Sequence, residues 1–302
     1  MRNKRLTSLT AVGVIAALLL ASFGYLYFNK LWIFASDEKD SYGEAYVDFI
    51  DCGQGDSSLI VSNDCVTLID TTTAQSAQNV VDHLEDRGIE KIDHLVLTHP
   101  HEDHIGGTSM VLDTVEVETI YMKEPTKGTK PTSKVYKTLI DRIKDEAIEV
   151  SWVEVGDSFE CGDFNFTVLG PTEDYKDQNN QSIVLMAEYD DVSVLFTGDQ
   201  EEKAEKDLIE EYGYALDVTV LKAGHHGSKG STCDAFLDVV RPEYSVISCG
   251  EGNSYGHPHD EFLERMEERN ITYYRTDRDG TVTVYTNGDT VTIEKQVKAD
   301  NS

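Results

Sequence analysis

The sequence predicts a mixed α/β fold in which two β-sheets pack together with helices outside, preceded by one N-terminal transmembrane helix. Short β-rich runs follow one another as a meander after residue 44, and strand and helix patterns alternate further along the chain. An uncharged apolar run near the N-terminus predicts the membrane span. With 302 residues, of which 39% are hydrophobic, the chain is long and apolar enough for one large folded domain.

The N-terminal segment begins with basic residues and continues as a long uncharged run. Residues 6–28 contain no charged side chain, and a helix needs roughly 20 apolar residues to cross a bilayer. Because the basic residues precede this run, the positive-inside rule leaves the N-terminus in the cytoplasm and the remainder outside. We therefore expect a basic tip and membrane anchor at 1–35 and a linker at 36–43. A cleaved secretory signal, which would release a secreted domain, is the alternative.

The main domain is expected over residues 44–296, followed by a short tail at 297–302. Its first three strands are separated by the turn sequences at 53–55 and 62–64, and Gly88 ends the first helix. Alternation and apolar runs predict strands at 46–51, 57–61, 66–70, 92–98, 119–122, 149–153, 164–169, 182–189, 192–197, 218–221, 244–248, 281–286 and 290–294. Helical spacing predicts helices at 77–87, 133–146, 200–212, 233–239 and 259–269.

The chain is strongly acidic, with 56 Asp and Glu against 26 Lys and Arg and a net charge of −30. Such a surface repels the phosphate backbone, which argues against a broad nucleic-acid-coating role unless a local patch reverses the sign. Residues 123–144 are such a patch, because they hold seven basic and two acidic residues. The lysines predicted to guide a phosphate backbone, here or beside the loop at residue 225, are Lys127, Lys130, Lys134, Lys137, Lys222 and Lys229. A solvated helix face is the alternative interpretation.

The five cysteines form an odd set without a CxxC pair, which indicates neither a disulfide framework nor a cysteine-rich zinc site. Cys52 and Cys65 flank a predicted strand and could approach one another. Two isolated buried thiols are the expected state of this pair.

A cluster of metal-binding side chains follows the strand predicted at 92–98. His99, His101, Asp103 and His104 lie within six residues, and the glycine pair at 106–107 permits the tight turn that would bring them together. Imidazole and carboxylate ligands together suit Zn, Mn or Fe. The sequence therefore predicts a metal site at this strand end.

At these residues the sequence resembles the metallo-β-lactamase superfamily. Segments 67–71, 195–199 and 221–228 fit that family in order, as do segments typical of the metallo-β-lactamase-like domain of ComEC-type DNA-uptake proteins. Those further segments are 47–57, the doublet at 225–226 with its following Gly-Ser, 253–258 and 275–280. The resemblance covers roughly residues 44–296 and implies a four-layer αββα sandwich.

The resemblance also implies a ligand set for one or two divalent ions, either Zn or Mn. His99 and His101 would bind one metal, Asp103, His104 and His225 would bind the second, and Asp199 would bridge them. Asp70 would orient the motif, and His226 would be either an alternative ligand or a group facing the substrate. The residues that would act in catalysis are Asp103, Asp199 and His226.

One position departs from the family pattern. The superfamily usually has a further His before the bridging Asp, but residues 105–224 contain none. Asn180 and Ser182 lie in that stretch, and the first site would be completed by water or assisted by His257. The alternative is that His257 is an ordinary loop residue.

A metal site of this kind predicts hydrolysis, because a bound cation lowers the pKa of its water to about 7. We expect a membrane-anchored, extracytoplasmic phosphodiesterase or nuclease that acts on DNA. Hydrolysis of an ester, thioester or lactam is the first alternative, and a metal-binding interaction module without turnover is the second. The sequence identifies no protein partner.

Overall fold

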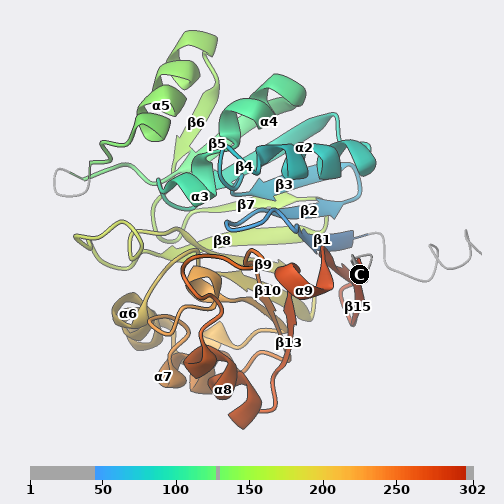
Figure 1. The fold of residues 1–302 in the computed structure, drawn as a ribbon, viewed down its shortest axis with the longest axis vertical. Coiled ribbons are helices and arrows are strands. Elements are labelled where there is room, and N and C mark those ends of the chain that lie inside the picture. The colour runs from blue at the N-terminus through green and yellow to red at the C-terminus, as the bar shows by residue number, and fades with distance from the viewer. Residues whose placement is uncertain (1–44, 127–129, 297–302) are drawn as a thin grey trace, which may run out of the picture. The chain divides into compact units, whose positions relative to one another are not determined.

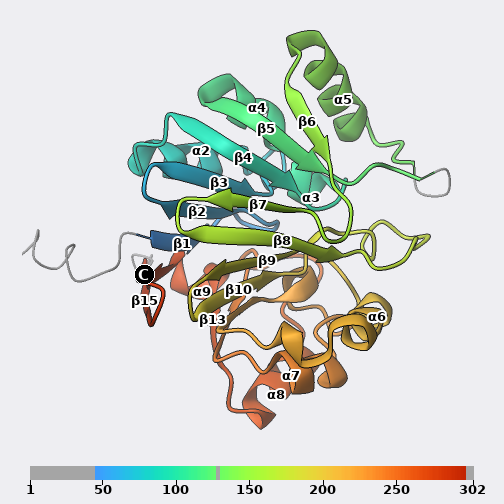
Figure 2. The same cartoon turned by 180° about the vertical axis from the view of Figure 1, so that it is seen from behind.

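A computed structural model describes residues 45–126 and 130–296, which form two β-sheets with helices on their outer faces (Figures 1 and 2). The arrangement is the four-layer αββα sandwich that the sequence predicts. The expected anchor and linker lie outside these residues. Within the described ranges, no helix is both long enough and apolar enough to cross a membrane.

The first sheet has eight strands in the order β15-β14-β1-β2-β3-β4-β5-β6. Its strands are β1 (Ala45–Phe49), β2 (Ser58–Ser62), β3 (Cys65–Ile69), β4 (Lys91–Leu97), β5 (Glu116–Met122), β6 (Glu149–Trp152), β14 (Val282–Thr286) and β15 (Val291–Lys295). Strands β3 to β6 are parallel, whereas β15 to β3 are antiparallel. The carboxyl ends of the parallel strands therefore share one edge, where ligands commonly bind in open α/β sheets.

The second sheet has seven strands in the order β13-β12-β11-β10-β9-β8-β7. Its strands are β7 (Ser158–Cys161), β8 (Phe164–Gly170), β9 (Val184–Tyr189), β10 (Val192–Phe196), β11 (Val220–Lys222), β12 (Tyr244–Ile247) and β13 (Thr272–Arg275). Strands β10 to β13 run parallel. This sheet, like the first, thus presents a row of parallel strand ends.

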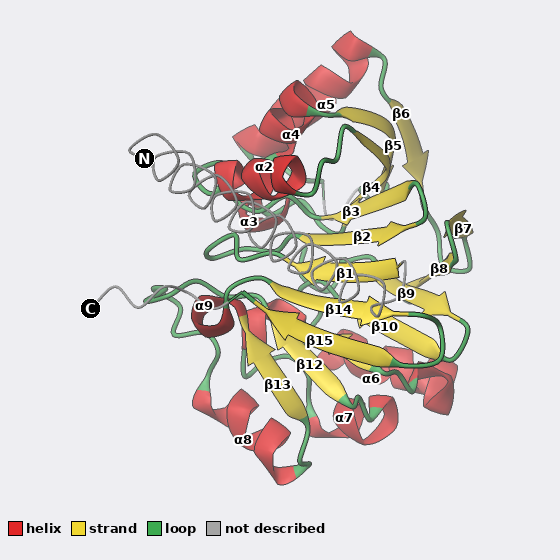
Figure 3. Ribbon diagram, turned by 90° about the vertical axis from the view of Figure 1, so that its right-hand side faces the viewer, coloured by secondary structure: helices red, strands yellow, loops and turns green. Residues whose placement is uncertain are grey.

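Helices cover the outer face of each sheet (Figure 3). Over the first sheet lie α2 (Ala77–Asp86), α3 (Glu102–Ile105), α4 (Thr108–Thr114) and α5 (Lys134–Glu146). Over the second lie α6 (Glu202–Tyr212), α7 (Asp234–Val240) and α8 (Asp260–Glu268). The shorter elements are α9 (Thr276–Asp279) and the 3-10 turns η1 (Gly213–Leu216) and η2 (Gly224–Gly227).

Three apolar layers hold the sandwich together. The central layer lies between the sheets and includes Phe49, Phe166 and Phe196, all buried. The two outer layers pack each sheet against its helices, around residues such as Leu84 and Phe236. Burying one such side chain stabilises the fold by about 1.5–3 kcal/mol. Because each layer buries many of them, the ends of the strands are held in fixed positions.

A disulfide joins Cys65 on β3 to Cys161 on β7, across 96 residues of chain, and so ties the first sheet to the second. The expectation that Cys65 is an isolated thiol was therefore wrong, whereas Cys52 is a buried free thiol as expected. A disulfide typically stabilises a domain by about 2–4 kcal/mol.

Candidate metal centre

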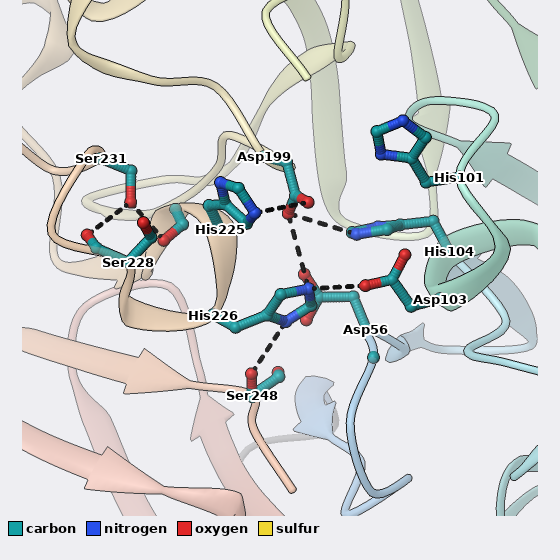
Figure 4. A network of polar contacts seen from close by, with 12 residues as sticks. Asp56, His101, Asp103, His104, Asp199, His225, His226, Ser228, Ser231 and Ser248 are labelled. Carbon is teal, nitrogen blue, oxygen red and sulfur yellow. Dashed lines mark hydrogen bonds and ion pairs between the residues drawn. The ribbon is translucent and has the colours of Figure 1, made fainter. Parts of the chain in front are cut away.

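The candidate site lies where parallel strands of both sheets end (Figure 4). From the first sheet, Asp70 follows β3 and His99 follows β4. From the second sheet, Asp199 follows β10 and the doublet His225-His226 lies in η2 after β11. Residues more than 100 positions apart are thus brought together by the packing of the two sheets.

The loop after β4 can turn tightly because its glycines, which lack a side chain, allow close contact with neighbouring backbone. A Cβ on Gly107 would lie 2.1 Å from the carbonyl oxygen of Thr71, so only glycine fits there. The Thr71 N–H donates to the carbonyl oxygen of His104 at 2.7 Å, which fixes α3 against the end of β3. The turn predicted from the glycine pair is therefore confirmed.

Asp70 is buried and orients His104. Its Oδ2 lies 2.7 Å from His104 Nδ1, while its Oδ1 accepts the Thr98 N–H at 2.8 Å. With Nδ1 held by a carboxylate, the Nε2 of His104 faces the centre of the site. A histidine that ligates a metal commonly has this second partner, so the predicted orienting role of Asp70 agrees with the geometry.

Two groups of side chains at this site are close enough for each to hold a cation, and both include Asp199. The ligand atoms within each group lie within 4.8 Å of one another. The first group is His99, His101 and Asp199; the second is Asp56, His104, Asp199 and His226. The shared carboxylate is the arrangement expected of a bridging ligand.

Asp199 stands at the centre of these contacts (Figure 4). Its Oδ1 is 3.2 Å from His104 Nε2 and 3.7 Å from His226 Nε2, whereas its Oδ2 is 3.6 Å from His99 Nε2. The two oxygens therefore face different histidines. The Asp199 N–H donates to Ser182 Oγ at 3.1 Å, which fixes the carboxylate at the strand end.

The buried polar atoms at the centre fit a cation. The Nδ1–H of His226 donates to the Ser248 carbonyl at 3.0 Å, so its Nε2 carries the lone pair in the neutral ring. His226 Nε2, His104 Nε2 and Asp199 Oδ1 are buried without a hydrogen-bond partner. Buried polar atoms normally have partners, so three such atoms converging on one point indicate a missing ligand. Imidazole nitrogens and carboxylate oxygens suit Zn or Mn.

The electrostatics of the site also favour a cation. Burial lowers the pKa of His99 and, less strongly, that of His101, so both imidazoles are neutral and able to ligate. Burial would likewise lower the pKa of His104, but Asp199 and Asp70 raise it well above its usual value. Two buried carboxylates that stabilise a proton there would equally stabilise a metal ion.

The two members of the histidine doublet have different surroundings. His225 is partly exposed, its Nε2 lies 3.6 Å from Asp199 Oδ2, and its Nδ1 lies 3.3 Å from Glu201 Oε1. His226 is fully buried and belongs to the second group. The structure therefore favours His226, the alternative ligand, over His225 in the second site. Both have left-handed backbone angles, with φ of 45° and 56°.

Asp103 lies beside the second group and is not part of it. Its Oδ2 is 3.3 Å from His226 Nε2. Burial alone would raise the pKa of Asp103, but the neighbouring imidazoles of His226 and His104 together hold it below its usual range. The carboxylate is therefore ionised and faces the open side of the site.

The remaining predicted residues divide between the site and its support. His257 lines the pocket above the metal groups. Burial lowers its pKa to about 4, so its ring is neutral. Asn180 accepts the Glu201 N–H through Oδ1 at 2.9 Å, and Ser182 binds the Asp199 backbone, so both support the fold around Asp199. Neither side chain replaces the missing histidine as a member of the two groups.

Two of the predicted substrate lysines are not placed at the site. Lys222 is 3% exposed, and its Nζ lies 2.8 Å from Asp56 Oδ2 in a buried ion pair. The prediction that Lys222 contacts a phosphate backbone was therefore wrong. Lys229 is exposed, pairs with Glu261 at 3.5 Å and does not line the pocket.

The turn at residues 53–56, which the sequence predicts only as a connection between two strands, contributes to the site. The Asp56 N–H donates to the Asp103 carbonyl at 3.0 Å, and a Cβ on Gly55 would lie 2.7 Å from that same oxygen. Asp56 consequently belongs to the second metal group, and Gln54 lines the pocket. The signal for both residues is the Gly-Gln-Gly-Asp sequence at 53–56, which lies in the segment 47–57 that resembles ComEC-type proteins.

The family model described as "Metallo-beta-lactamase superfamily" matches residues 50–251, a span that contains both donor groups. The chain belongs to this superfamily. Its fold is therefore one whose members are generally metal-dependent hydrolases.

The relatives extend the match to competence proteins. The chain is 33% identical over 258 residues to ComE operon protein 3 of Bacillus subtilis, covering 79% of this chain and 33% of the relative. It is 34% identical over 241 residues to Competence protein ComA of Neisseria gonorrhoeae, covering 78% and 32%. The chain thus spans about a third of the length of these relatives. The predicted resemblance to the metallo-β-lactamase-like domain of ComEC-type proteins is confirmed.

Solved structures with the same fold are more distant. CmlA, a diiron β-hydroxylase from Streptomyces venezuelae, aligns with a TM-score of 0.55 at 15% identity, covering 81% of this chain and 54% of CmlA. The metallo-β-lactamase fold protein YhfI from Bacillus subtilis aligns with a TM-score of 0.53 at 10% identity, covering 80% and 100%. At these identities the likeness shows the fold alone.

Proposed function

We propose that this protein is a metal-dependent phosphodiesterase or nuclease that acts on DNA outside the cytoplasm. The observation that carries the proposal is the pair of donor groups that share Asp199. When bound there, a pair of divalent ions would supply a nucleophile at neutral pH and neutralise charge on the attacking and leaving oxygens of a phosphodiester. The relatives named as competence proteins support DNA as the substrate.

The chain's own residues would orient the ions and move protons. Asp70 holds the His104 ring, the Ser248 carbonyl holds His226, and both contacts direct Nε2 toward the centre. Asp103 faces the pocket as an ionised carboxylate and can orient an attacking water. His225, which lines the pocket beside Glu201, would give a proton to a leaving oxygen.

Comparison of three substrate classes tests this function. Metal-loaded full-length protein would be assayed with DNA, a chromogenic carboxylic ester and a lactam. We expect metal-dependent cleavage of DNA, and much slower hydrolysis of the ester and the lactam. Preference for the ester or lactam would support the alternative hydrolase, and no turnover of any substrate would support a metal-binding module.

A basic surface supports DNA binding. A groove of about 830 Å³ lies over α5 and β6, and its lining includes Lys130, Lys137, Lys144 and Trp152. A smaller apolar pocket shares Pro131 with this groove and reaches His99. The groove and the smaller pocket therefore share a wall, and the smaller pocket also touches His99. Lys127 lies outside the described residues.

Charge reversal of this patch should weaken DNA binding without removing hydrolysis of a small phosphodiester. Each lost phosphate contact should lower the slope of log K against log salt by about 0.7–0.9. We therefore expect the triple variant Lys130→Glu, Lys134→Glu and Lys137→Glu to lower DNA affinity and to flatten the slope by about 2–3. Salt titration of binding, measured by fluorescence anisotropy, checks this result.

The matched control is the triple change of Lys91, Lys203 and Lys206 to Glu, which alters the net charge equally. These exposed lysines lie outside the groove. Equal effects of the two triple variants would mean that only net charge matters, and the groove would then be ordinary surface.

We also propose that the domain is membrane-anchored on the outer side. The basic flank and apolar run at 1–35 support this orientation. The Cys65–Cys161 disulfide supports it as well, because such bonds persist in oxidising compartments.

Protease added to intact cells with their outer layers stripped should then remove the domain, as followed with an antibody against the C-terminus. If the domain is fully protected in cells and is cleaved only after lysis, the orientation is the opposite of the one proposed. Release of a soluble form that lacks about the first 35 residues would instead indicate a cleaved signal.

A further inference from the structure

An exposed tyrosine stands at the mouth of the metal centre. Tyr255 is 64% exposed and lines the same pocket of about 320 Å³ as His101, Asp103 and Asp199. Exposed aromatic rings beside a site are common contacts for ligand rings, because they bring large contact area with few rotatable bonds. Neither the metal groups nor the proposed chemistry uses this residue.

The loop that carries Tyr255 is held rigidly by one side chain. Asn253 Nδ2 donates to the carbonyls of Gly250 at 2.9 Å and His257 at 2.6 Å. Asn253 Oδ1 accepts the N–H groups of Tyr255 at 3.1 Å and His257 at 3.0 Å. The ring of Tyr255 is consequently presented from a fixed backbone.

Three rings form a stack from the pocket mouth to the metal centre. The Tyr255 and His257 centroids are 5.7 Å apart with 20° between their planes, and those of His257 and His226 are 6.0 Å apart with 26°. His226 belongs to the second metal group. One face of Tyr255 is therefore occupied by His257, and a planar ligand ring could stack against the rest of this exposed side chain.

A free hydrogen-bond donor lies in the same pocket. Gln54 Oε1 accepts the Gly250 N–H at 3.0 Å, so the side-chain amide has a defined orientation. Its Nε2 is then the donor atom of the amide, and it is buried without a hydrogen-bond partner. Asn179, also in this pocket, has an unpartnered buried Oδ1. Buried amide atoms left unpaired in a pocket indicate contacts that a ligand completes.

We propose that Tyr255 and Gln54 form a nucleobase subsite beside the metal centre. Tyr255 stacks on the base of the nucleotide whose phosphate occupies the metal groups, and Gln54 Nε2 donates to a carbonyl oxygen or ring nitrogen of that base. A flat ring with hydrogen-bonding edges next to a phosphate is the chemistry of a nucleotide, and the inference in this sense rests on the proposed function. Esters and lactams that lack such a ring would not use the subsite.

Equilibrium binding tests the subsite without requiring turnover. The full-length protein, loaded with Mn²⁺, would be titrated calorimetrically with thymidine 5′-monophosphate and with 2-deoxyribose 5-phosphate, which lacks the base. We expect the nucleotide to bind about 10-fold or more tightly, the size that stacking of one base on an aromatic side chain produces. Tyr255→Ala should abolish this preference, and Tyr255→Phe should keep it.

Tyr214→Ala is the matched control, because Tyr214 is 71% exposed and lies in η1, away from the pocket. That variant should retain the full preference. Equal binding of the two ligands by the unchanged protein, or a preference that survives in Tyr255→Ala, overturns the subsite. Because binding is measured apart from cleavage, a base preference without DNA hydrolysis would overturn only the proposed function.

Discussion

Replacing Asp199 with Asn should abolish hydrolysis and remove bound metal. The carboxylate is shared by both donor groups, so the substitution takes a negative charge from each of them while keeping the shape of the side chain. Loss of an outer partner of a metal ligand already lowers metal affinity or activity about 10–100-fold, so loss of the shared ligand should have a larger effect. Metal content after dialysis, measured by mass spectrometry, and the rate of DNA cleavage check the result.

The control for this change is Asp289→Asn, which removes the same charge from an exposed turn between β14 and β15. It should keep both metal and activity. Wild-type metal content and turnover in Asp199→Asn would contradict the bridging role, and with it the assignment of both groups as one centre. His101→Ala, which alters only the first group, should lose less metal than Asp199→Asn.

The first cluster could be predicted from sequence because its members are local. Four ligand-type side chains within six residues, followed by a glycine pair, leave few backbone conformations, and the structure places His99, His101 and His104 together. Most strands and the longer helices were likewise predicted, since their apolar periodicity is strong. Among the shortest elements, β7, β13 and α3 were not predicted, because a run of four residues carries little pattern.

The parts that were missed depend on contacts between distant segments. The disulfide joins residues 96 positions apart, and its pairing is decided by how β3 and β7 meet across the two sheets. Lys222 appeared available for phosphate, but strand β11 directs it into a buried pair with Asp56, 166 positions away. No local pattern distinguishes a lysine that faces solvent from one that neutralises a carboxylate between two sheets.

The doublet His225-His226 shows the same limit within a single turn. Adjacent residues of the same type cannot be told apart by sequence pattern, and the left-handed backbone at both positions decides which ring enters the centre. The structure turns His226 inward, where the Ser248 carbonyl holds it, and leaves His225 partly exposed beside Glu201. The two residues should therefore differ in a measurable way.

We expect His226→Asn to lose one equivalent of metal and at least about 100-fold in turnover, because loss of a direct ligand should exceed the roughly 10–100-fold cost of an outer partner. His225→Asn should keep both equivalents and lose turnover mainly where the leaving oxygen needs a proton. A leaving group of low pKa, such as p-nitrophenol, needs less protonation, so His225→Asn should be less impaired with thymidine 5′-(p-nitrophenyl) phosphate than with DNA. Metal stoichiometry and the two rates, measured for both variants, check this division of roles. The reverse pattern, with metal lost in His225→Asn and retained in His226→Asn, would restore His225 as the ligand of the second site.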